Sequence, residues 1–125
     1  MNMKNFIYRF KSTRDWDNMV SGKISIDDYL EKLPYKPTVY IEEEAWRIVD
    51  HMRGGNDEYF QEKFGVTFED YKAKSFEEQK KIILKRVKSE YDNDSRHITE
   101  RFVQGVLIKF IDDFITFLNS ALGIK

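Results

Sequence analysis

The 125-residue sequence contains no cysteine and only two prolines. The lack of cysteine excludes a disulfide framework and a thiolate zinc site, and it is typical of a reducing compartment. Two prolines leave long stretches in which helices can form. The most apolar stretch, 102–118, is interrupted by Lys109, Asp112 and Asp113, so it fails the roughly 18-residue uncharged criterion for a membrane span. No apolar stretch at the start has the length of a signal peptide. We therefore expect a cytoplasmic protein with no membrane partner.

The composition is that of a folded chain: aromatic residues make up 15% and charged residues 34%, with a net charge of −1. Disordered chains have few aromatics, and a net charge near zero gives no overall field that attracts nucleic acid. This length favours a single domain covering residues 1–125. The charges are nevertheless segregated. Residues 39–70 carry three basic and nine acidic side chains, whereas residues 72–88 carry seven basic and two acidic ones.

The spacing of apolar residues predicts an all-α fold of five to seven helices packed around a long C-terminal helix. That helix is expected from about Ser95, its predicted cap, to Leu122, because apolar residues there recur at steps of three, four and one. Gly105 in its middle predicts close approach of a neighbouring helix. Phe110 lies on the apolar stripe and is expected to be buried.

Shorter periodic segments predict the remaining helices. Ser25 and Ser75 stand in capping positions, and Ser75 with Glu78 forms a capping box for a helix over residues 76–91. Residues 1–11 remain open between an irregular, a helical and a short strand conformation. The other predicted helices lie within residues 12–22, 25–34, 38–54, 56–65 and 67–71.

Residues suited to catalysis or metal binding are few. His51 and His97 are the only histidines, and neither stands in a nucleophile elbow or in a zinc-binding pattern. Gly54 and Gly55 lack the lysine and the spacing of a phosphate-binding loop. We predict no catalytic, cofactor-binding or metal-binding residues and expect a protein that is not an enzyme.

Basic residues on the helix over 76–91 offer one binding hypothesis. Lys81, Lys85 and Lys88 share a helix face, because they are separated by steps of four and three. Such a face is able to contact phosphates, which makes a nucleic-acid-binding regulator the first alternative. A solvated face, or attraction to the acidic segment of the same chain, explains the lysines equally well.

Arg96 and His97 suggest a second alternative, a ribonuclease-like helical enzyme, although adjacent residues do not share a helix face. The competing interpretation is that Arg96 and Arg101 pair with nearby acids such as Asp92, Asp94 and Glu100.

Binding to another protein is the leading hypothesis, because aromatic-rich and charge-segregated surfaces suit protein partners. Glu42 and Glu43, in the acidic segment, join the lysines and arginines above as candidate binding residues. The richness in Lys, Ile, Asn, Phe and Tyr is typical of an A+T-rich genome. By analogy with small proteins of that kind, we expect a toxin-immunity protein or a phage-encoded inhibitor. Ile108 and Phe117 lie off the main stripe of the C-terminal helix, which leaves a homo-oligomer through that helix open.

Overall fold

The computed structural model describes residues 14–33, 36–53, 55–93 and 95–124, and all regular secondary structure in these ranges is helical. This confirms the predicted all-α class. Residues 14–20 are helical and precede seven helices: α2 (Ile26–Glu31), α3 (Thr38–Met52), α4 (Asp57–Phe64), α5 (Phe68–Lys72), α6 (Phe76–Tyr91), α7 (Ile98–Lys109) and α8 (Ile111–Ala121). The interpretation of residues 1–11 lies outside the described residues.

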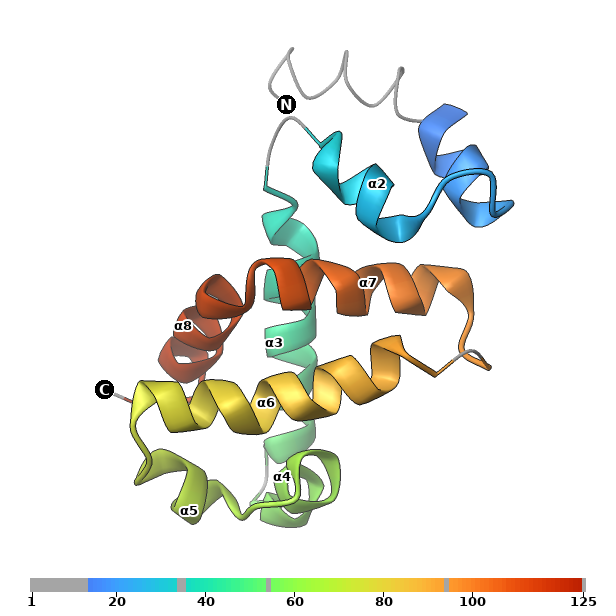
Figure 1. Cartoon of the computed structure of the whole chain (residues 1–125). Coiled ribbons are helices and arrows are strands. Elements are labelled where there is room, and N and C mark those ends of the chain that lie inside the picture. Colours follow the sequence, from blue (N-terminus) through green and yellow to red (C-terminus); the bar gives the residue numbers. More distant parts are fainter. Residues whose placement is uncertain (1–13, 34–35, 54, 94, 125) are drawn as a thin grey trace.

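Helix α3 runs through the middle of the molecule (Figure 1). Helices α6 and α7 form an antiparallel pair that crosses it, and α8 turns off the end of α7 to pack along α3. Helices α4 and α5 lie at one end of α3, and α2 packs on α7 at the other. Helix α3 therefore contacts elements from both halves of the chain.

The core lies where α3, α6, α7 and α8 meet. Ala45 and Ile48 of α3 and Phe114 and Leu118 of α8 are completely buried. Phe60 of α4 is also completely buried and contacts the ring of Tyr71 at 4.9 Å between centroids. The apolar stripes recognised in the sequence thus converge on one cluster.

Side-chain caps define several helix starts. Ser25 and Ser75 act as predicted, and Thr67 does the same: each hydroxyl oxygen accepts a hydrogen bond from the N–H three residues on, at 3.0, 3.2 and 3.1 Å respectively. Ser95 does not cap the last segment. Instead His97 does so, since its Nδ1 accepts a hydrogen bond from the N–H of Thr99 at 3.2 Å.

The predicted C-terminal helix begins at Ile98, three residues after its predicted start, and it is interrupted at one residue instead of running unbroken. Phe110 has φ −114° and ψ 41°, outside the helical region, and divides the segment into α7 and α8. Asp112 and Asp113 stand in the first turn of α8, where carboxylates favour the helix N-terminus. They also pair with Lys80 at 2.9 Å and Lys36 at 2.7 Å. The bend directs α8 along α3, and it leaves Phe110 half-buried instead of buried as predicted.

Gly105 allows the close helix approach that the sequence predicted. A Cβ atom at this position would lie 3.2 Å from Ile26 Cγ2, 3.2 Å from Tyr91 Cε2 and 3.3 Å from Leu30 Cδ1. The lack of a side chain therefore lets α2 and the end of α6 pack against α7.

We expect Gly105→Ala to lower the free energy of unfolding by about 1 to 2 kcal/mol, although alanine is the better helix former by about 1 kcal/mol. Three neighbouring side chains, two on α2 and one on α6, must move at once, so overpacking outweighs propensity. Urea denaturation measures the change. Ser89→Ala on the exposed side of α6 is the control and should alter stability by less than about 0.5 kcal/mol. A G105A variant that is more stable than the unmodified protein would contradict this prediction and show that the neighbouring side chains move aside at little cost.

A closed set of hydrogen bonds ties α5, α6 and α8 together. The Tyr71 hydroxyl donates to Oδ1 of Asn119 at 2.7 Å, and Nδ2 of Asn119 donates to Oε1 of Gln79 at 2.9 Å. Nε2 of Gln79 donates a hydrogen bond to the main-chain oxygen of Tyr71 at 3.0 Å, which closes the set. Burial raises the pKa of Tyr71 well above its ordinary value.

The raised pKa of Tyr71 predicts a loss of stability at alkaline pH. Above about pH 10 the unfolded chain loses the Tyr71 proton while the folded chain keeps it, so the free energy of unfolding falls as pH rises. Tyr71→Phe should cost about 1 kcal/mol at neutral pH through the lost hydrogen bond. The free energy of unfolding of this variant, measured by urea denaturation, should then decline less steeply between about pH 9 and 11 than that of the unmodified protein. Part of the decline should remain, because burial also raises the pKa of Tyr59 and Tyr91. Parallel curves for the two proteins would contradict this role of Tyr71.

Candidate functional site

The basic face of α6 is present as the sequence predicted. Lys81, Lys85 and Lys88 are all exposed, and within the described ranges none of them forms an ion pair. The other two basic residues of this helix are engaged. Lys80 pairs with Asp112 at 2.9 Å, and Arg86 pairs with Glu90 at 3.1 Å. Among the described residues, the three lysines are therefore not partners of the acidic segment.

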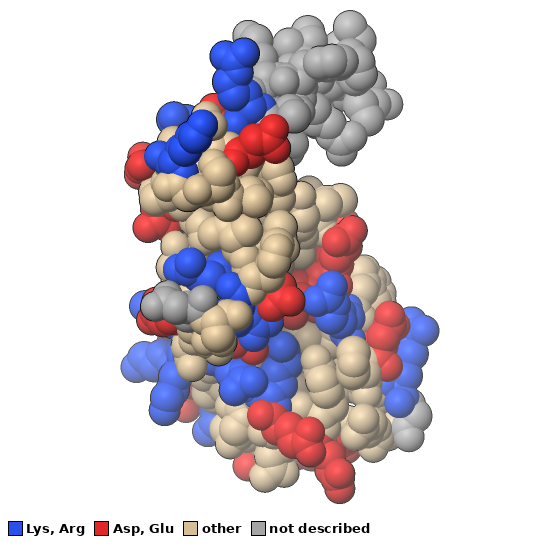
Figure 2. Space-filling model, turned by 90° about the vertical axis from the view of Figure 1, so that its right-hand side faces the viewer, with Lys and Arg blue, Asp and Glu red and all other residues tan. Residues whose placement is uncertain are grey.

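Charges of both signs alternate on the side of the molecule where α6 meets α7. Figure 2 shows this side, with basic side chains gathered at mid-height and acidic ones between them. A mixed surface of this kind attracts a polyanion less strongly than a uniformly basic one.

The structure gives Arg96, His97 and Arg101 separate partners. Arg96 pairs with Glu100 at 3.2 Å, as the competing interpretation proposed. The ring of His97 is engaged in capping α7 and lies 2.8 Å from the hydroxyl of Thr99. Arg101 donates to the main-chain oxygen of Tyr91 at 3.1 Å and lies over the Tyr91 ring, with no acid bound among the described residues. Arg96 and His97 are thus held in different interactions.

The outward face of α3, defined here as Val39, Glu42, Glu43, Trp46 and Asp50, lies opposite the core face of the same helix. These positions are separated by steps of three, one, three and four, which places them within about 100° on a helix of 3.6 residues per turn. Val39 is 56% exposed and Trp46 is 45% exposed, and only two other large apolar residues in the described ranges are comparably exposed. The face is thus an apolar pair flanked by carboxylates.

The exposed tryptophan is held in place by a neighbouring ring. Trp46 contacts the ring of Phe117 edge-on, with centroids 6.1 Å apart and planes at 82°. Glu42 and Glu43 form no ion pair in the part of the chain that the structure describes, whereas Asp50 pairs with Arg53 at 3.4 Å. An open hollow of about 480 Å³ lies along this face.

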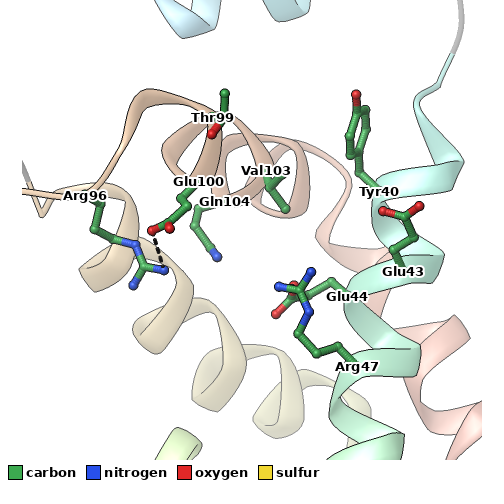
Figure 3. A pocket seen from close by; sticks show the side chains of 9 residues that line it. All are labelled: Tyr40, Glu43, Glu44, Arg47, Arg96, Thr99, Glu100, Val103 and Gln104. Carbon is green, nitrogen blue, oxygen red and sulfur yellow. Dashed lines mark hydrogen bonds and ion pairs between the residues drawn. The ribbon is translucent and has the colours of Figure 1, made fainter.

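A smaller pocket of about 250 Å³ opens between α3 and the start of α7 (Figure 3). Helix α3 contributes Tyr40, Glu43, Glu44 and Arg47 to its walls. The opposite wall consists of Arg96, Thr99, Glu100, Val103 and Gln104. Glu43 and Arg47 also line the hollow along α3, so the two depressions are adjacent.

Polar atoms without partners mark this pocket. The side chain of Gln104 extends into the space between the two helices in Figure 3, and the residue is only 5% exposed. Its Oε1 is buried and accepts no hydrogen bond from the described residues, and Nε of Arg96 likewise has no acceptor. Buried polar atoms in native proteins nearly always have partners, so unpaired ones require an explanation.

A chain of ion pairs centred on buried Glu44 lies beneath the pocket. Glu44 is buried and binds Arg47 at 3.2 Å and Lys63 at 3.8 Å. Lys63 also reaches Glu90 at 3.9 Å, and Glu90 binds Arg86 at 3.1 Å. This network, Arg47–Glu44–Lys63–Glu90–Arg86, connects α3, α4 and α6 and fixes Arg47 in the pocket wall. Besides burial, the carboxylates of Glu44 and Glu90 raise the pKa of Tyr59.

The described residues contain no group of three or more His, Cys, Asp or Glu side chains placed to hold a metal ion. None of the helices in the described ranges has the length and apolarity needed to cross a bilayer.

Comparison with protein-family models, with curated proteins and with solved structures found no match.

Sequence reasoning placed Glu42 and Glu43 among the binding residues but missed Val39, Trp46 and Gln104. The signal for the first two was available, because they are seven residues apart and so lie on the same side of α3, away from its core stripe. Gln104 gave no such signal. Its position among apolar residues of α7 predicts burial, but its lack of a hydrogen-bond partner depends on what α3 brings opposite to it.

We expect Lys63→Met to lower the free energy of unfolding by about 2 kcal/mol, because it removes the cation shared by two buried carboxylates. The expected loss of stability is moderate because Glu44 still pairs with Arg47 and Glu90 still pairs with Arg86. Lys72→Met is the matched control: Lys72 pairs with exposed Glu69 at 3.1 Å, and its loss should cost less than about 0.5 kcal/mol. Equal effects of the two substitutions in chemical denaturation would show that the buried network adds nothing to stability.

Proposed function

We propose that this chain is a non-enzymatic protein-binding domain that inhibits or regulates another protein by docking the outward face of α3 against it. The observation that carries the proposal is the pair of exposed apolar side chains, Val39 and Trp46, next to Glu42 and Glu43, which form no ion pair among the described residues. An apolar centre with a charged rim is the usual anatomy of a protein interface, and tryptophan is enriched among the residues that dominate binding energy.

The charge of this face determines the chemistry of the partner. Glu42, Glu43 and Asp50 make it acidic, so the complementary surface is basic and carries an apolar depression for Trp46. Electrostatic attraction would speed association and select against acidic competitors. The contact of Trp46 with Phe117 restrains its ring before binding, which reduces the entropy lost on association.

A nucleic-acid-binding regulator is the second candidate, and one observation favours it: Lys81, Lys85 and Lys88 are exposed and unpaired in the described ranges. They form a row roughly 10 Å long at 1.5 Å per residue. Three phosphate contacts would give a shallow salt dependence. The row ranks second because its surroundings do not include the exposed aromatic and apolar pair that α3 provides.

The test begins with affinity purification from cells that encode the chain, with and without nuclease, followed by identification of the captured protein. That protein, produced separately, should bind the purified chain in calorimetry. Trp46→Ala should weaken binding by about 30-fold or more, the magnitude typical of an interface tryptophan. Hydrogen exchange of the complex should show protection on α3.

Two control variants make this test specific. Phe76→Ala removes another exposed aromatic side chain, which is 38% exposed at the start of α6, and should leave binding unchanged. The triple variant Lys81→Gln, Lys85→Gln and Lys88→Gln should also bind normally. Nuclease-sensitive capture that the triple variant loses and W46A retains would contradict the proposal and support the nucleic-acid candidate.

A further inference from the structure

We infer that the outward face of α3 in one copy of this chain binds the basic row of α6 in a second copy. The basic row consists of Lys81, Lys85 and Lys88, which are exposed and form no ion pair among the described residues. Glu42 and Glu43 on the outward face of α3 are exposed and unpaired in the same ranges. Each surface therefore carries the charge that complements the other. The net charge of −1 gives two copies little overall repulsion.

The two surfaces match in length as well as in charge. Glu43 and Asp50 are seven residues apart on α3, and the first and last lysines of the basic row are also seven residues apart. Both separations correspond to roughly 10 Å along a helix. Two antiparallel or parallel helices can therefore place the outer lysines near the two carboxylates and the middle lysine over the ring of Trp46, where a cation is attracted. The ion pair of Asp50 with Arg53 is exposed on both sides, so it competes only weakly.

The basic row also offers apolar surface to the exposed side chains of α3. Leu84 lies three residues after Lys81 and four before Lys88, which places it on the same side of α6, and it is half-buried. Lysine side chains in addition have long apolar stems that cover neighbouring apolar groups while the ammonium stays in water. Val39 and Trp46 would thus meet Leu84 and these stems, with the charges around them, as in the usual anatomy of an interface.

The directions of the two surfaces make the contact head to tail. Glu44 and Ile48 of α3 line the same interior space as Val87 and Glu90 of α6, and the two helices cross in Figure 1. The outward face and the basic row lie opposite these residues on their own helices, so they point away from each other. A single copy cannot bring its two surfaces together, and two copies cannot close both contacts at once. Such a heterologous contact repeats from copy to copy.

The first experiment is sedimentation equilibrium of the full chain, freed of nucleic acid so that no polyanion links the copies. We expect a dissociation constant on the order of 100 μM for each contact, because exposed ion pairs and partly exposed apolar contacts are individually weak. The average mass should pass that of two copies as the concentration rises toward about 1 mM. Between about 0.05 and 0.5 M salt the contact should weaken about fivefold or more, since salt screens exposed charges.

Two variants, each with one surface removed, test which surfaces meet. The face variant combines Glu42→Gln, Glu43→Gln and Trp46→Ala. The row variant is the triple lysine-to-glutamine variant described above. Each should stay monomeric alone, because it keeps only one of the two surfaces. An equimolar mixture should form dimers and nothing larger, because the intact row of one variant binds the intact face of the other.

A control variant tests whether loss of any two carboxylates has the same effect. Glu58→Gln with Glu62→Gln removes two exposed carboxylates of α4 that form no ion pair in the described ranges, and it should associate like the unmodified chain. All the substituted positions are exposed, so the variants should keep their fold, which circular dichroism and urea denaturation would verify.

Three results would overturn the inference. The first is an unmodified chain that stays monomeric up to about 1 mM. The second is self-association of the row variant, which would show that two α3 faces pair with each other. The third is a mixture of the two variants that remains monomeric.

The inference does not depend on the proposed docking of a different protein, and the two can fail separately. If the unmodified chain is monomeric but W46A weakens binding of the captured protein, the contact between copies is wrong and docking through α3 stands. If the variants complement each other while W46A leaves binding of the captured protein unchanged, the contact between copies stands and the proposed docking is wrong.

Discussion

The arrangement of this protein depends on a chain of alternating charges, with buried Glu44 within it, where α3, α4 and α6 meet. Glu44 and Glu90 are carboxylates removed from water, and each is retained at a modest cost only because cations from other turns reach it. The alternation restricts how the three helices can rotate, since a turn of α3 about its axis would separate Glu44 from Lys63. Once Glu44 faces inward, the positions on the opposite side of α3 must face outward. The orientation of the candidate interface is therefore a consequence of the buried charges.

Apolar periodicity was sufficient to predict most of the architecture. It identified the all-α class, the extent of α6 and the position of the core stripe on α3, because burial of one helix face imposes a spacing that is visible in the sequence. It also led to Gly105, whose role follows from the local cost of a glycine within a helix. The bend at Phe110 was not predictable in this way. Apolar residues continue at helical spacing across it, and the ion pairs made at the start of α8 involve Lys36 and Lys80, which are distant in sequence from Asp113 and Asp112.

The candidate site was only partly predictable for the same reason. Charge segregation drew attention to Glu42, Glu43 and Arg96, and the structure places Glu43 and Arg96 in a single pocket. The character of this pocket depends on an unpaired amide and on which arginines already pair with carboxylates. Both are properties of pairs of side chains from different helices. A single sequence records which residues exist, whereas the balance of partners among them arises only when α3 and α7 come together.

The opposed faces of α3 have a consequence for how such a chain can change during evolution. Val39, Glu42 and Glu43 lie opposite the residues that bind α8 and the buried carboxylate of Glu44, and each is exposed. Substitutions at exposed positions of this kind usually alter stability by less than about 0.5 kcal/mol. The outer face is therefore free to diverge while the inner face is constrained. Under the proposed docking, lineages of this chain can follow changes in a partner's surface, or acquire a different partner, through a few replacements on a single helix without passing through an unstable intermediate.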